Sequence, residues 1–448
     1  MTKQFDVIII GAGPGGYETA IYAAQKGLSV AIVEKEYLGG TCLNEGCIPT
    51  KCLCHDAQII DEMNVSSDFE KIEYNFSIDK AQGRKNEVVR NLREGISTLI
   101  KTQGITQILG VASFIDSHTI CVNGDTSEIY SAKNIIIATG SCTKILPIEG
   151  ISLPGVYTSA EMLNIDFIPQ RLCIIGGGVI GMEFASIFKS FGSQVHVIEF
   201  CKEILPPFDE DIAKRLRQSL KKQNIEFSLQ SAVTKIEKNG NSLLVTYNQK
   251  DKEKSTEADV VLMAVGRCAN LNSLNLNDVG VICNARGIVV DENMQTNIPG
   301  VYAVGDINGL CQLAHAASFQ GKVALQHILG EKSQIQLGIM PSAVFTNPEV
   351  AMVGKTEGQC KAENREIVVH KSFYRANGKA LSMEASEGLI KILEDEEGYI
   401  LGAHILGAHA ADLIHEIVLA MNSNIKFQQL KDVVHTHPTL SEIILNAI

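Results

Sequence analysis

The sequence predicts an α/β protein with two doubly wound parallel sheets and an α+β domain at its C-terminal end. Two observations carry this prediction. A strand–glycine turn–helix–strand unit near the N-terminus recurs 165 residues later, and the pattern changes after about residue 338. At roughly 100–200 residues per domain, a chain of 448 residues is also expected to contain two to four domains.

The first unit opens with an apolar run, residues 5–10, which predicts a buried strand. A glycine-rich turn, residues 11–16, leads into a predicted helix at 17–26, and a second predicted strand at 29–33 ends in an acid. The second unit has the same parts, with strands at 172–175 and 194–198. The residues that recur are Gly11, Gly13, Gly16 and Glu34 in the first unit and Gly176, Gly178, Gly181 and Glu199 in the second.

Each glycine in such a turn has a physical task. One allows the tight turn, one lets the backbone approach a pyrophosphate, and one permits close packing of helix on strand. The helix N-terminus supplies amide donors for phosphates, and the acid accepts hydrogen bonds from ribose hydroxyls. A single copy also occurs as a plain strand–helix connection. Two copies, each followed by its acid, predict two dinucleotide sites.

The rest of the chain divides less sharply. Residues 79–103 predict a long helix, and we interpret its cations, Arg84, Lys85, Arg90, Arg93 and Lys101, as a solvated face. Predicted strands at 134–138, 259–265 and 301–304 stop at glycines, which is typical of the carboxyl edge of a parallel sheet, where ligands bind. In the last part, segments 388–393 and 399–406 predict an antiparallel hairpin, followed by a helix at 408–422 and a short C-terminal helix.

A cysteine cluster follows the first unit. Cys42 and Cys47 are five residues apart, and Pro49 suits the first turn of a helix. The positive end of that helix favours a thiolate, and Lys51 lies one turn further on the same face. This arrangement of thiolate, second thiol and cation is what electron relay from a dithiol to a flavin requires.

A metal site is the alternative for this cluster. Cys42, Cys47, Cys52, Cys54 and His55 all carry possible ligands. Structural zinc sites usually hold two separated pairs of ligands, and the sequence offers no second pair. We therefore expect no metal, and we interpret Cys52 and Cys54 as packing or partly exposed thiols.

A second candidate group lies near the C-terminal end. His437 and Glu442 are five residues apart and could form an oriented acid–base pair, although a pair at a helix start is also typical of a structural contact. We interpret His435 as the structural histidine, because Pro438 restricts the backbone beside His437.

Composition excludes several classes. Lys and Arg number 39 against 51 Asp and Glu, so the net charge of −12 opposes non-specific nucleic-acid binding. No apolar run approaches the ~18 residues of a membrane span, and the first residues do not resemble a signal peptide. We expect a cytoplasmic protein without a membrane or nucleic-acid partner. Most of its twelve cysteines should be buried thiols, and any disulfide is expected to be catalytic.

Taken together, these motifs resemble those of the class I pyridine nucleotide–disulfide oxidoreductases. The resemblance covers essentially the whole chain and rests on segments 11–16, 39–51, 138–140, 176–183, 264–267, 304–306, 313–317 and 437–442. It implies FAD in the first dinucleotide site, NAD in the second, and a redox disulfide formed by Cys42 and Cys47. His437, oriented by Glu442, is implied to be a base that acts across a homodimer interface on the partner's disulfide.

The resemblance also implies further site residues and a domain division. Lys51 is implied to lie near the flavin and to pair with Glu183 beside the nicotinamide. The expected domains are 1–145 for FAD, 146–268 for NAD, 269–337 completing the FAD site, and 338–448 at the dimer interface. The remaining implied cofactor contacts are Thr41, Ala112, Thr139, Gly140, Asp306 and Ala314 for FAD, and Val233, Ala264 and Gly266 for NAD.

The implied activity is oxidation of protein-bound dihydrolipoyl groups, with electrons passing through the dithiol and FAD to NAD. The implied partner is a lipoyl-bearing protein of a 2-oxo acid, acetoin or glycine cleavage system. Reductases of glutathione or mercuric ion are alternatives within the family; Glu199 opposes the 2′-phosphate that the first needs, and no C-terminal cysteine pair serves the second. A metal-binding or redox-sensing module is the alternative from another class. The sequence departs from the family pattern at Glu45, Cys52, Cys54 and Gln320.

Overall fold

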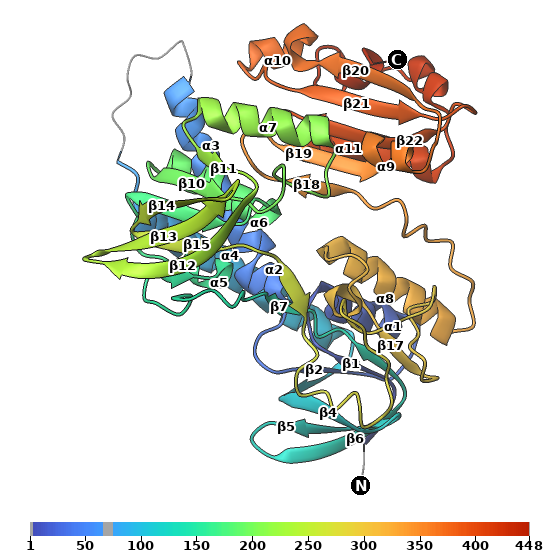
Figure 1. The fold of residues 1–448 in the computed structure, drawn as a ribbon. Helices are drawn as coiled ribbons and strands as arrows, with labels where there is room; N and C mark the ends of the chain where they lie inside the picture. The colour runs from blue at the N-terminus through green and yellow to red at the C-terminus, as the bar shows by residue number, and fades with distance from the viewer. Residues whose placement is uncertain (1–2, 66–74, 448) are drawn as a thin grey trace. The chain divides into compact units, whose positions relative to one another are not determined.

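The computed structural model describes residues 3–65 and 75–447. The chain forms two compact units that alternate along the sequence (Figure 1). Unit 1 consists of Met1–Thr50, Gln82–Lys144 and Arg267–Leu337, and unit 2 consists of Lys51–Ala81, Ile145–Gly266 and Gly338–Ile448.

Unit 1 is built on a seven-stranded sheet with a parallel part and an antiparallel part. The parallel strands follow the order β3-β2-β1-β6, and β17 pairs with the C-terminal end of β6. Strands β4 and β5 extend the sheet as an antiparallel meander from β6. The strands are β1 (Lys3–Ile10), β2 (Val30–Glu34), β3 (Thr106–Leu109), β4 (Val111–Asp116), β5 (Thr119–Asn123), β6 (Ser127–Ile137) and β17 (Val301–Ala303).

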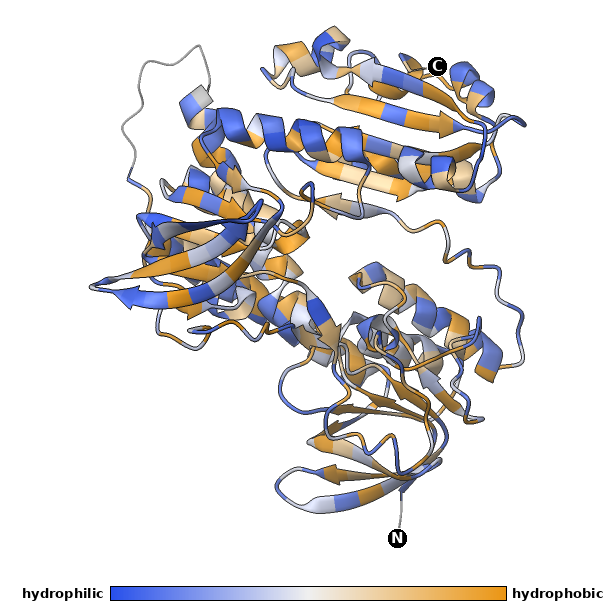
Figure 2. Ribbon diagram, in the orientation of Figure 1, coloured by the Kyte–Doolittle hydropathy of each residue, from blue (hydrophilic) through white to orange (hydrophobic). Residues whose placement is uncertain are grey.

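Two helices of unit 1 lie side by side against the parallel strands, α1 (Pro14–Gln25) and α8 (Ala314–Ile328) (Figure 1). A Cβ on Gly321 of α8 would lie 1.7 Å from Oγ1 of Thr19 in α1, so only glycine permits this packing. Figure 2 shows hydrophobic colouring along the strands that these helices cover. The other elements of unit 1 are α2 (Gly40–Glu45), β7 (Ser141–Thr143), β16 (Arg267–Ala269) and the 3-10 turn η1 (Gly305–Asn308); α3 (Cys47–Val65) and α4 (Ile78–Thr102) each continue across a unit boundary.

Unit 2 contains a five-stranded parallel sheet in the order β11-β10-β9-β15-β8. This order matches the parallel strands of unit 1, and a separate antiparallel meander, β12-β13-β14, again accompanies the sheet. The elements are β8 (Val156–Tyr157), α5 (Ser159–Met162), β9 (Arg171–Ile175), α6 (Val179–Ser190), β10 (Gln194–Ile198), α7 (Glu210–Lys222), β11 (Glu226–Ser228), β12 (Ser231–Asn239), β13 (Ser242–Gln249), β14 (Lys252–Ala258) and β15 (Val260–Met263).

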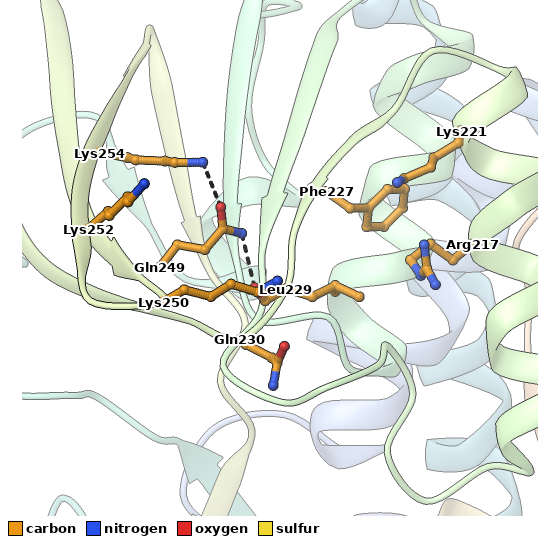
Figure 3. Close-up of a pocket in the computed structure, with 9 residues that line it drawn as sticks. All are labelled: Arg217, Lys221, Phe227, Leu229, Gln230, Gln249, Lys250, Lys252 and Lys254. Carbon is orange, nitrogen blue, oxygen red and sulfur yellow. Dashed lines mark hydrogen bonds between the residues drawn. The ribbon is translucent and has the colours of Figure 1, made fainter.

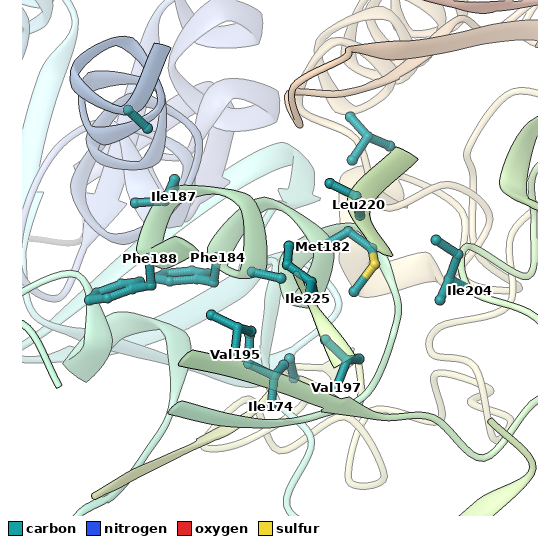
Figure 4. Close-up of a cluster of buried hydrophobic side chains, with 14 of the residues drawn as sticks. Ile174, Met182, Phe184, Ile187, Phe188, Val195, Val197, Ile204, Leu220 and Ile225 are labelled. Atoms are coloured by element: carbon teal, nitrogen blue, oxygen red, sulfur yellow. The ribbon is translucent and has the colours of Figure 1, made fainter. Parts of the chain in front are cut away.

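The largest core of unit 2 lies between this parallel sheet and the helices that cover it. Phe184 and Phe188 of α6 stack with ring centroids 6.2 Å apart, over Ile174 and Val195 of the central strands (Figure 4). Leu220 of α7 is fully buried in the same cluster. Burial of these large apolar side chains is the main force that holds the helices on the sheet.

The last part of unit 2 is an antiparallel sheet in the order β18-β19-β22-β21-β20, packed against α11. Figure 1 shows this part in orange and red. Its elements are β18 (Ser342–Val344), β19 (Val350–Gly354), α9 (Glu357–Ala362), β20 (Val368–Phe373), η2 (Tyr374–Ala376), α10 (Gly378–Ser382), β21 (Leu389–Glu394), β22 (Ile400–Leu406), α11 (Ala410–Asn422), η3 (Phe427–Asp432) and α12 (Glu442–Leu445).

The predicted fold class and the internal repeat are confirmed, and the predicted strand at 194–198 coincides with β10. The strand predicted at 134–138 is longer, because β6 begins at Ser127 and first pairs with β5. The four-domain division stays a prediction. The expectation that most cysteines are buried is wrong, because Cys52, Cys173 and Cys360 are buried and the other nine are half-buried or exposed. Among residues 3–65 and 75–447, no helix combines the length and the apolar character needed to cross a bilayer.

Candidate dinucleotide, dithiol and acid–base sites

The first glycine turn has a backbone that only glycine can form. Gly11 follows β1 with φ of +104°, and a Cβ there would lie 2.4 Å from the carbonyl oxygen of Ala138. A Cβ on Gly16 would lie 1.9 Å from the carbonyl oxygen of Gly11, so α1 could not approach β1. Gly13 is the N-cap of α1, and its Cβ position has no protein atom nearer than 3.8 Å. This open position at a helix N-terminus fits the pyrophosphate of FAD.

Glu34 closes the same turn from the end of β2. The side chain is buried, and its Oε2 accepts a hydrogen bond of 2.8 Å from the Ala12 amide. Oε1 accepts from the amides of Lys35 at 2.8 Å and Glu36 at 3.0 Å. These three donors fix the carboxylate at the carboxyl edge of the sheet, where a ribose would approach.

The second glycine turn, in unit 2, repeats this construction. Gly176 has φ of +108°, with the carbonyl oxygen of Ala264 2.3 Å from its Cβ position, and a Cβ on Gly181 would lie 2.0 Å from the Gly176 oxygen. Glu199 accepts hydrogen bonds from the amides of Gly177 and Cys201. The Cβ position of Gly178 is open, so this turn also fits a dinucleotide pyrophosphate. Gly266, with φ of +105°, lies two residues after Ala264, and Val233 lies half-buried in β12.

The other residues predicted to contact FAD lie at several places in unit 1. Thr139 and Gly140 follow β6, and Thr139 Oγ1 donates to the Asn270 carbonyl at 3.0 Å. Asp306 lies in η1, where its Oδ2 accepts from Ser141 Oγ at 2.5 Å. Ala112 is buried in β4, Ala314 is the first residue of α8, and Thr41 is exposed in α2.

Three residues that the sequence analysis did not assign organise the surroundings of Asp306. Arg267 donates from Nε to Ser141 Oγ at 2.7 Å and from Nη2 to the Ser141 carbonyl at 2.8 Å. Gln320 is buried in α8, and its Oε1 accepts from the Gly305 amide at 2.7 Å. The side-chain oxygen of Gln320 therefore accepts the hydrogen bond of the Gly305 amide, which a carboxylate at this position could also accept. Of these three residues, only Ser141 had a signal in the sequence, because it directly follows the Thr139-Gly140 turn.

The two cysteines lie in consecutive helices. Cys42 is half-buried in α2, and Cys47 is the exposed first residue of α3. Between them, Asn44 donates to the carbonyls of Leu38 and Gly40 and accepts from Arg93 Nη2 at 2.6 Å. Both cysteines are thus placed within the first turn of a helix, and α2 begins beside the first glycine turn, because the Gly39 amide donates to the Ala12 carbonyl at 2.8 Å. Among the described residues, no three Cys, His, Asp or Glu side chains gather in a metal-binding group.

The interpretation of the α4 cations as a solvated face is wrong at two positions. Arg93 is half-buried, where it holds Asn44 and lies 4.0 Å from the ring centroid of Tyr37. Lys85 is only 2% exposed. The charges of a long helix look alike in sequence, and only packing separates the solvated ones from these two.

Lys51 and Glu183 form an ion pair within unit 2. Lys51 Nζ, four residues after Cys47 in α3, lies 2.9 Å from Glu183 Oε1 and 3.0 Å from Oε2. Glu183, in α6, is 4% exposed and also accepts from the Phe345 amide at 3.0 Å. Next along α3, Cys52 is buried, and burial raises the pKa of the Cys54 thiol, whose sulfur donates to the Phe345 carbonyl.

His437 and Glu442 also form the expected pair. His437 Nδ1 lies 2.9 Å from Glu442 Oε1, and Glu442 Oε2 accepts from the Thr439 amide at 2.8 Å. The hydrogen bonds from Thr439 and His437 lower the pKa of Glu442. The His437 side chain is 79% exposed, whereas that of His435 is 6% exposed and contacts Glu416 at 2.9 Å. This contact agrees with the structural interpretation of His435.

A positively charged pocket of about 510 Å³ lies in unit 2 between α7 and the meander (Figure 3). Lys254 Nζ donates to Gln249 Oε1, and Gln249 in turn donates to the Leu229 carbonyl. Arg217, on the α7 side, is paired with Glu203 at 2.7 Å. None of the predicted site residues lines this pocket; the lining residues are Arg217, Lys221, Phe227, Leu229, Gln230, Gln249, Lys250, Lys252 and Lys254.

Known proteins match the chain over its whole length. Residues 5–321 match the family model described as pyridine nucleotide-disulphide oxidoreductase, and residues 340–448 match the dimerisation domain of the same family. The dihydrolipoyl dehydrogenase of Chlamydia muridarum is 41% identical, covering 99% of this chain and 96% of that protein. That of Bacillus subtilis is 39% identical with the same coverage.

A solved structure agrees with these sequence matches. The Cu(II) complex of the HOCl-induced flavoprotein disulfide reductase RclA from Escherichia coli superposes with a TM-score of 0.89 at 32% identity. The match covers 100% of this chain and 99% of the other. The two equivalent glycine turns and the two cysteines at helix starts agree with these matches, and the chain belongs to the pyridine nucleotide-disulphide oxidoreductase family and carries that family's dimerisation domain.

Proposed function

We propose that the protein is a homodimeric dihydrolipoyl dehydrogenase that uses FAD and NAD. The observation that carries this proposal is the placement of Cys42 and Cys47 in the first turns of α2 and α3, where α2 begins beside the first glycine turn through a hydrogen bond from the Gly39 amide to the Ala12 carbonyl. The second glycine turn, with Glu199, supports a separate site for NAD. Relatives of about 40% identity that match over nearly the full length carry the name dihydrolipoyl dehydrogenase.

The proposed reaction is a thiol–disulfide exchange at Cys42 and Cys47. One thiol of the dihydrolipoyl group loses its proton to His437 of the partner subunit and attacks Cys42, releasing Cys47 as a thiolate. The second substrate thiol then attacks the mixed disulfide, which frees Cys42 and leaves the substrate as a cyclic disulfide. The protein now holds the two electrons as a dithiol.

The remaining residues hold the cofactors. When bound, FAD supplies an acceptor for the electron pair of the dithiol, and NAD supplies the final hydride acceptor. The first dinucleotide would be held by Gly11, Gly13, Gly16 and Glu34. A further contact to the same dinucleotide would come from Asp306, which a hydrogen bond from Ser141 fixes in place. Lys51, held by Glu183, would place a positive charge one helical turn after Cys47, which favours the Cys47 thiolate.

The proton acceptor is proposed to come from a second subunit. His437 lies in the dimerisation domain, and its side chain is 79% exposed in the single chain, so no residue among 3–65 and 75–447 buries the imidazole. Val434, three residues before it, is 95% exposed, and Leu419 of α11 is 64% exposed. Apolar side chains this exposed beside a polar site are typical of a surface that a partner covers.

We further propose that the substrate is a lipoyl-bearing protein of a 2-oxo acid, acetoin or glycine cleavage system in the cytoplasm. The testing experiment is a visible spectrum of the purified protein, followed by steady-state assays with dihydrolipoamide and with glutathione disulfide, each with NAD(H) and NADP(H). A flavin spectrum and NAD-dependent oxidation of dihydrolipoamide are expected. If the protein turns over glutathione disulfide with NADPH and does not turn over dihydrolipoamide, the proposed substrate is wrong. If the protein is colourless and binds metal, the proposed reaction class is wrong.

A further inference from the structure

A second pair of cysteines faces each other outside the predicted site. Cys142 lies in β7 and Cys268 in β16, and the two strands form a two-stranded antiparallel sheet within unit 1. The register places Cys142 directly opposite Cys268, and their sulfur atoms are 3.3 Å apart. We propose that Cys142 and Cys268 are a redox-active dithiol that closes to an intrachain disulfide by exchange with a small-molecule disulfide.

The backbone geometry suits such a bond. Opposed residues of an antiparallel pair have Cα atoms roughly 4.5–5.5 Å apart, within the range of about 4.4–6.8 Å that disulfides span. The sulfur atoms must close by only about 1.3 Å to reach the bond length of ~2.05 Å. Side-chain rotation can supply this movement while the strands keep their pairing.

Neighbouring side chains hold the register that keeps the two thiols opposed. Arg267, directly before Cys268, donates to both the Oγ and the carbonyl oxygen of Ser141, directly before Cys142. Ser141 Oγ in turn donates to Asp306. A slip of one residue would break these contacts and turn one thiol to the opposite face of the sheet. The opposition of the thiols is therefore fixed by three polar contacts as well as by the strand pairing.

The accessibility of the two sulfur atoms sets the order of the exchange. Cys268 is exposed, whereas Cys142 is half-buried, and burial together with the nearby Cys268 sulfur raises the pKa of Cys142. Cys268 attacks the small disulfide first, which forms a mixed disulfide and releases one small thiol. Cys142 then attacks the Cys268 sulfur and releases the second. Two protein thiols are oxidised, one small disulfide is reduced, and the two protons end on the released thiols.

Cys142 and Cys268 flank one long segment of the chain, so a disulfide between them would link the two ends of that segment. The chain leaves unit 1 after Lys144 and returns at Arg267, so β7 and β16 are the two ends of the 145–266 segment. A Cys142–Cys268 disulfide closes that segment into a covalent loop. Because closure of a long loop restricts the unfolded chain, the oxidised protein should resist unfolding better than the reduced protein.

Peptide mapping of the native protein tests the proposal. After exposure to a series of oxidised-to-reduced glutathione ratios, remaining thiols are alkylated and the protein is digested with trypsin. Cys142 falls in peptide 134–144, and Cys268 falls in peptide 268–286 together with Cys283. A linked pair of these peptides, lighter by two hydrogen atoms than their sum, is expected at ratios that leave Cys283 alkylated. Mixed glutathione disulfides at Cys142 or Cys268 without linked peptide would overturn the proposal.

Variants assign the link and test its consequence. Cys283→Ser is the matched control and should keep the link, whereas Cys268→Ser and Cys142→Ser should each abolish it. A link that persists in Cys268→Ser would overturn the assignment. In urea unfolding under oxidising conditions, wild type should have a higher midpoint than Cys268→Ser, and the two should coincide after reduction. Equal urea midpoints of wild type and Cys268→Ser under both conditions would overturn the proposed stabilisation by a covalent link between β7 and β16.

Discussion

Glu442 holds one specific nitrogen of His437. Its Oε1 lies 2.9 Å from Nδ1 of the imidazole, and an amide hydrogen bond from Thr439 fixes the other carboxylate oxygen. Both contacts lower the pKa of Glu442, so the carboxylate is ionised at neutral pH and can only accept. Nδ1 must therefore carry the proton, and Nε2 of the neutral ring is left with a lone pair directed away from Glu442. This is the tautomer that a base requires.

Removal of the imidazole should slow thiol deprotonation far more than removal of its partner. His437→Ala should lose about 10²–10⁴-fold in kcat for dihydrolipoamide oxidation, the usual cost of losing a positioned base. Glu442→Gln should lose less, because the amide can still contact the ring. His435→Ala is the matched control and should change kcat for dihydrolipoamide oxidation only slightly. Electron flow from NADH to an artificial acceptor bypasses the disulfide and should survive in all three; its loss in His437→Ala would contradict the assigned role.

The two cysteines should be essential for turnover and dispensable for FAD. Cys42→Ser and Cys47→Ser should each abolish dihydrolipoamide oxidation, while the visible spectrum of bound FAD remains, since the glycine turn and Glu34 are proposed to hold it. Cys52→Ser is the control, because Cys52 is buried in the same helix, and it should stay active. Full activity of Cys42→Ser would remove this residue from the mechanism.

Local pattern predicted the framework of the molecule, because strand and helix periods and the glycine turns depend on neighbours in the sequence. β10 and the hairpin of β21 and β22 appear where the apolar runs predict them. The Lys51–Glu183 pair came only from the family resemblance, since 132 residues separate the two side chains. The contact of Arg93 with Asn44 had no local signal, and the position of Ser141 after the Thr139-Gly140 turn did not indicate Asp306 as its partner. Such pairs depend on which segments the folded sheet brings together.

Glu199 should select NAD over NADP. Its carboxylate is buried and fixed by backbone amides, and two cations nearby in the chain are already paired, Lys202 with Glu210 and Arg217 with Glu203. A 2′-phosphate would meet a like charge, which costs up to several kcal/mol, so kcat/KM should favour NAD by roughly a hundredfold or more. Glu199→Gln keeps the shape of the side chain without its charge, so it should reduce the ratio of kcat/KM for NAD to kcat/KM for NADP about tenfold. Comparable kcat/KM for both nucleotides in wild type would contradict this.

Lys391 should be a stability residue. It is 1% exposed, and its Nζ lies 2.7 Å from both Asp209 and Glu357. Lys391→Met would leave the buried Asp209 carboxylate without its cation and would leave Glu357 with Lys361 alone, so it should lower the free energy of unfolding by about 3–5 kcal/mol. Lys371, 34% exposed and 2.7 Å from Asp211, is the matched control. Lys371→Met should cost at most about 1 kcal/mol. Urea unfolding at pH 7 measures both, and equal losses would show that burial does not decide the cost.

The contribution of this cluster should also depend on pH. Hydrogen bonds from Lys361 and Lys391 lower the pKa of Glu357 to about 2. Burial favours the neutral form of Asp209, but the hydrogen bond and charge of Lys391, the charge of His404 and the Glu357 amide together outweigh it, and the pKa of Asp209 is lowered. A lowered folded-state pKa gives stability that is full above the unfolded value and is lost as pH falls through the folded one. The difference between wild type and Lys391→Met should therefore be constant near pH 7 and shrink below about pH 4.5.

A shared site between subunits predicts that two inactive variants restore activity together. Cys47→Ser lacks the proposed dithiol, and His437→Ala lacks the proposed base. In a mixed dimer, one of the two sites would combine the intact dithiol of the His437→Ala subunit with the partner subunit's His437. Co-expression with two different affinity tags and tandem purification isolates that dimer, and its mass verifies the composition. Dihydrolipoamide oxidation at up to about half the wild-type rate is then expected, because one of two sites is complete. Verified mixed dimers without turnover would show that each subunit uses its own histidine, while the thiol exchange itself could still proceed as described.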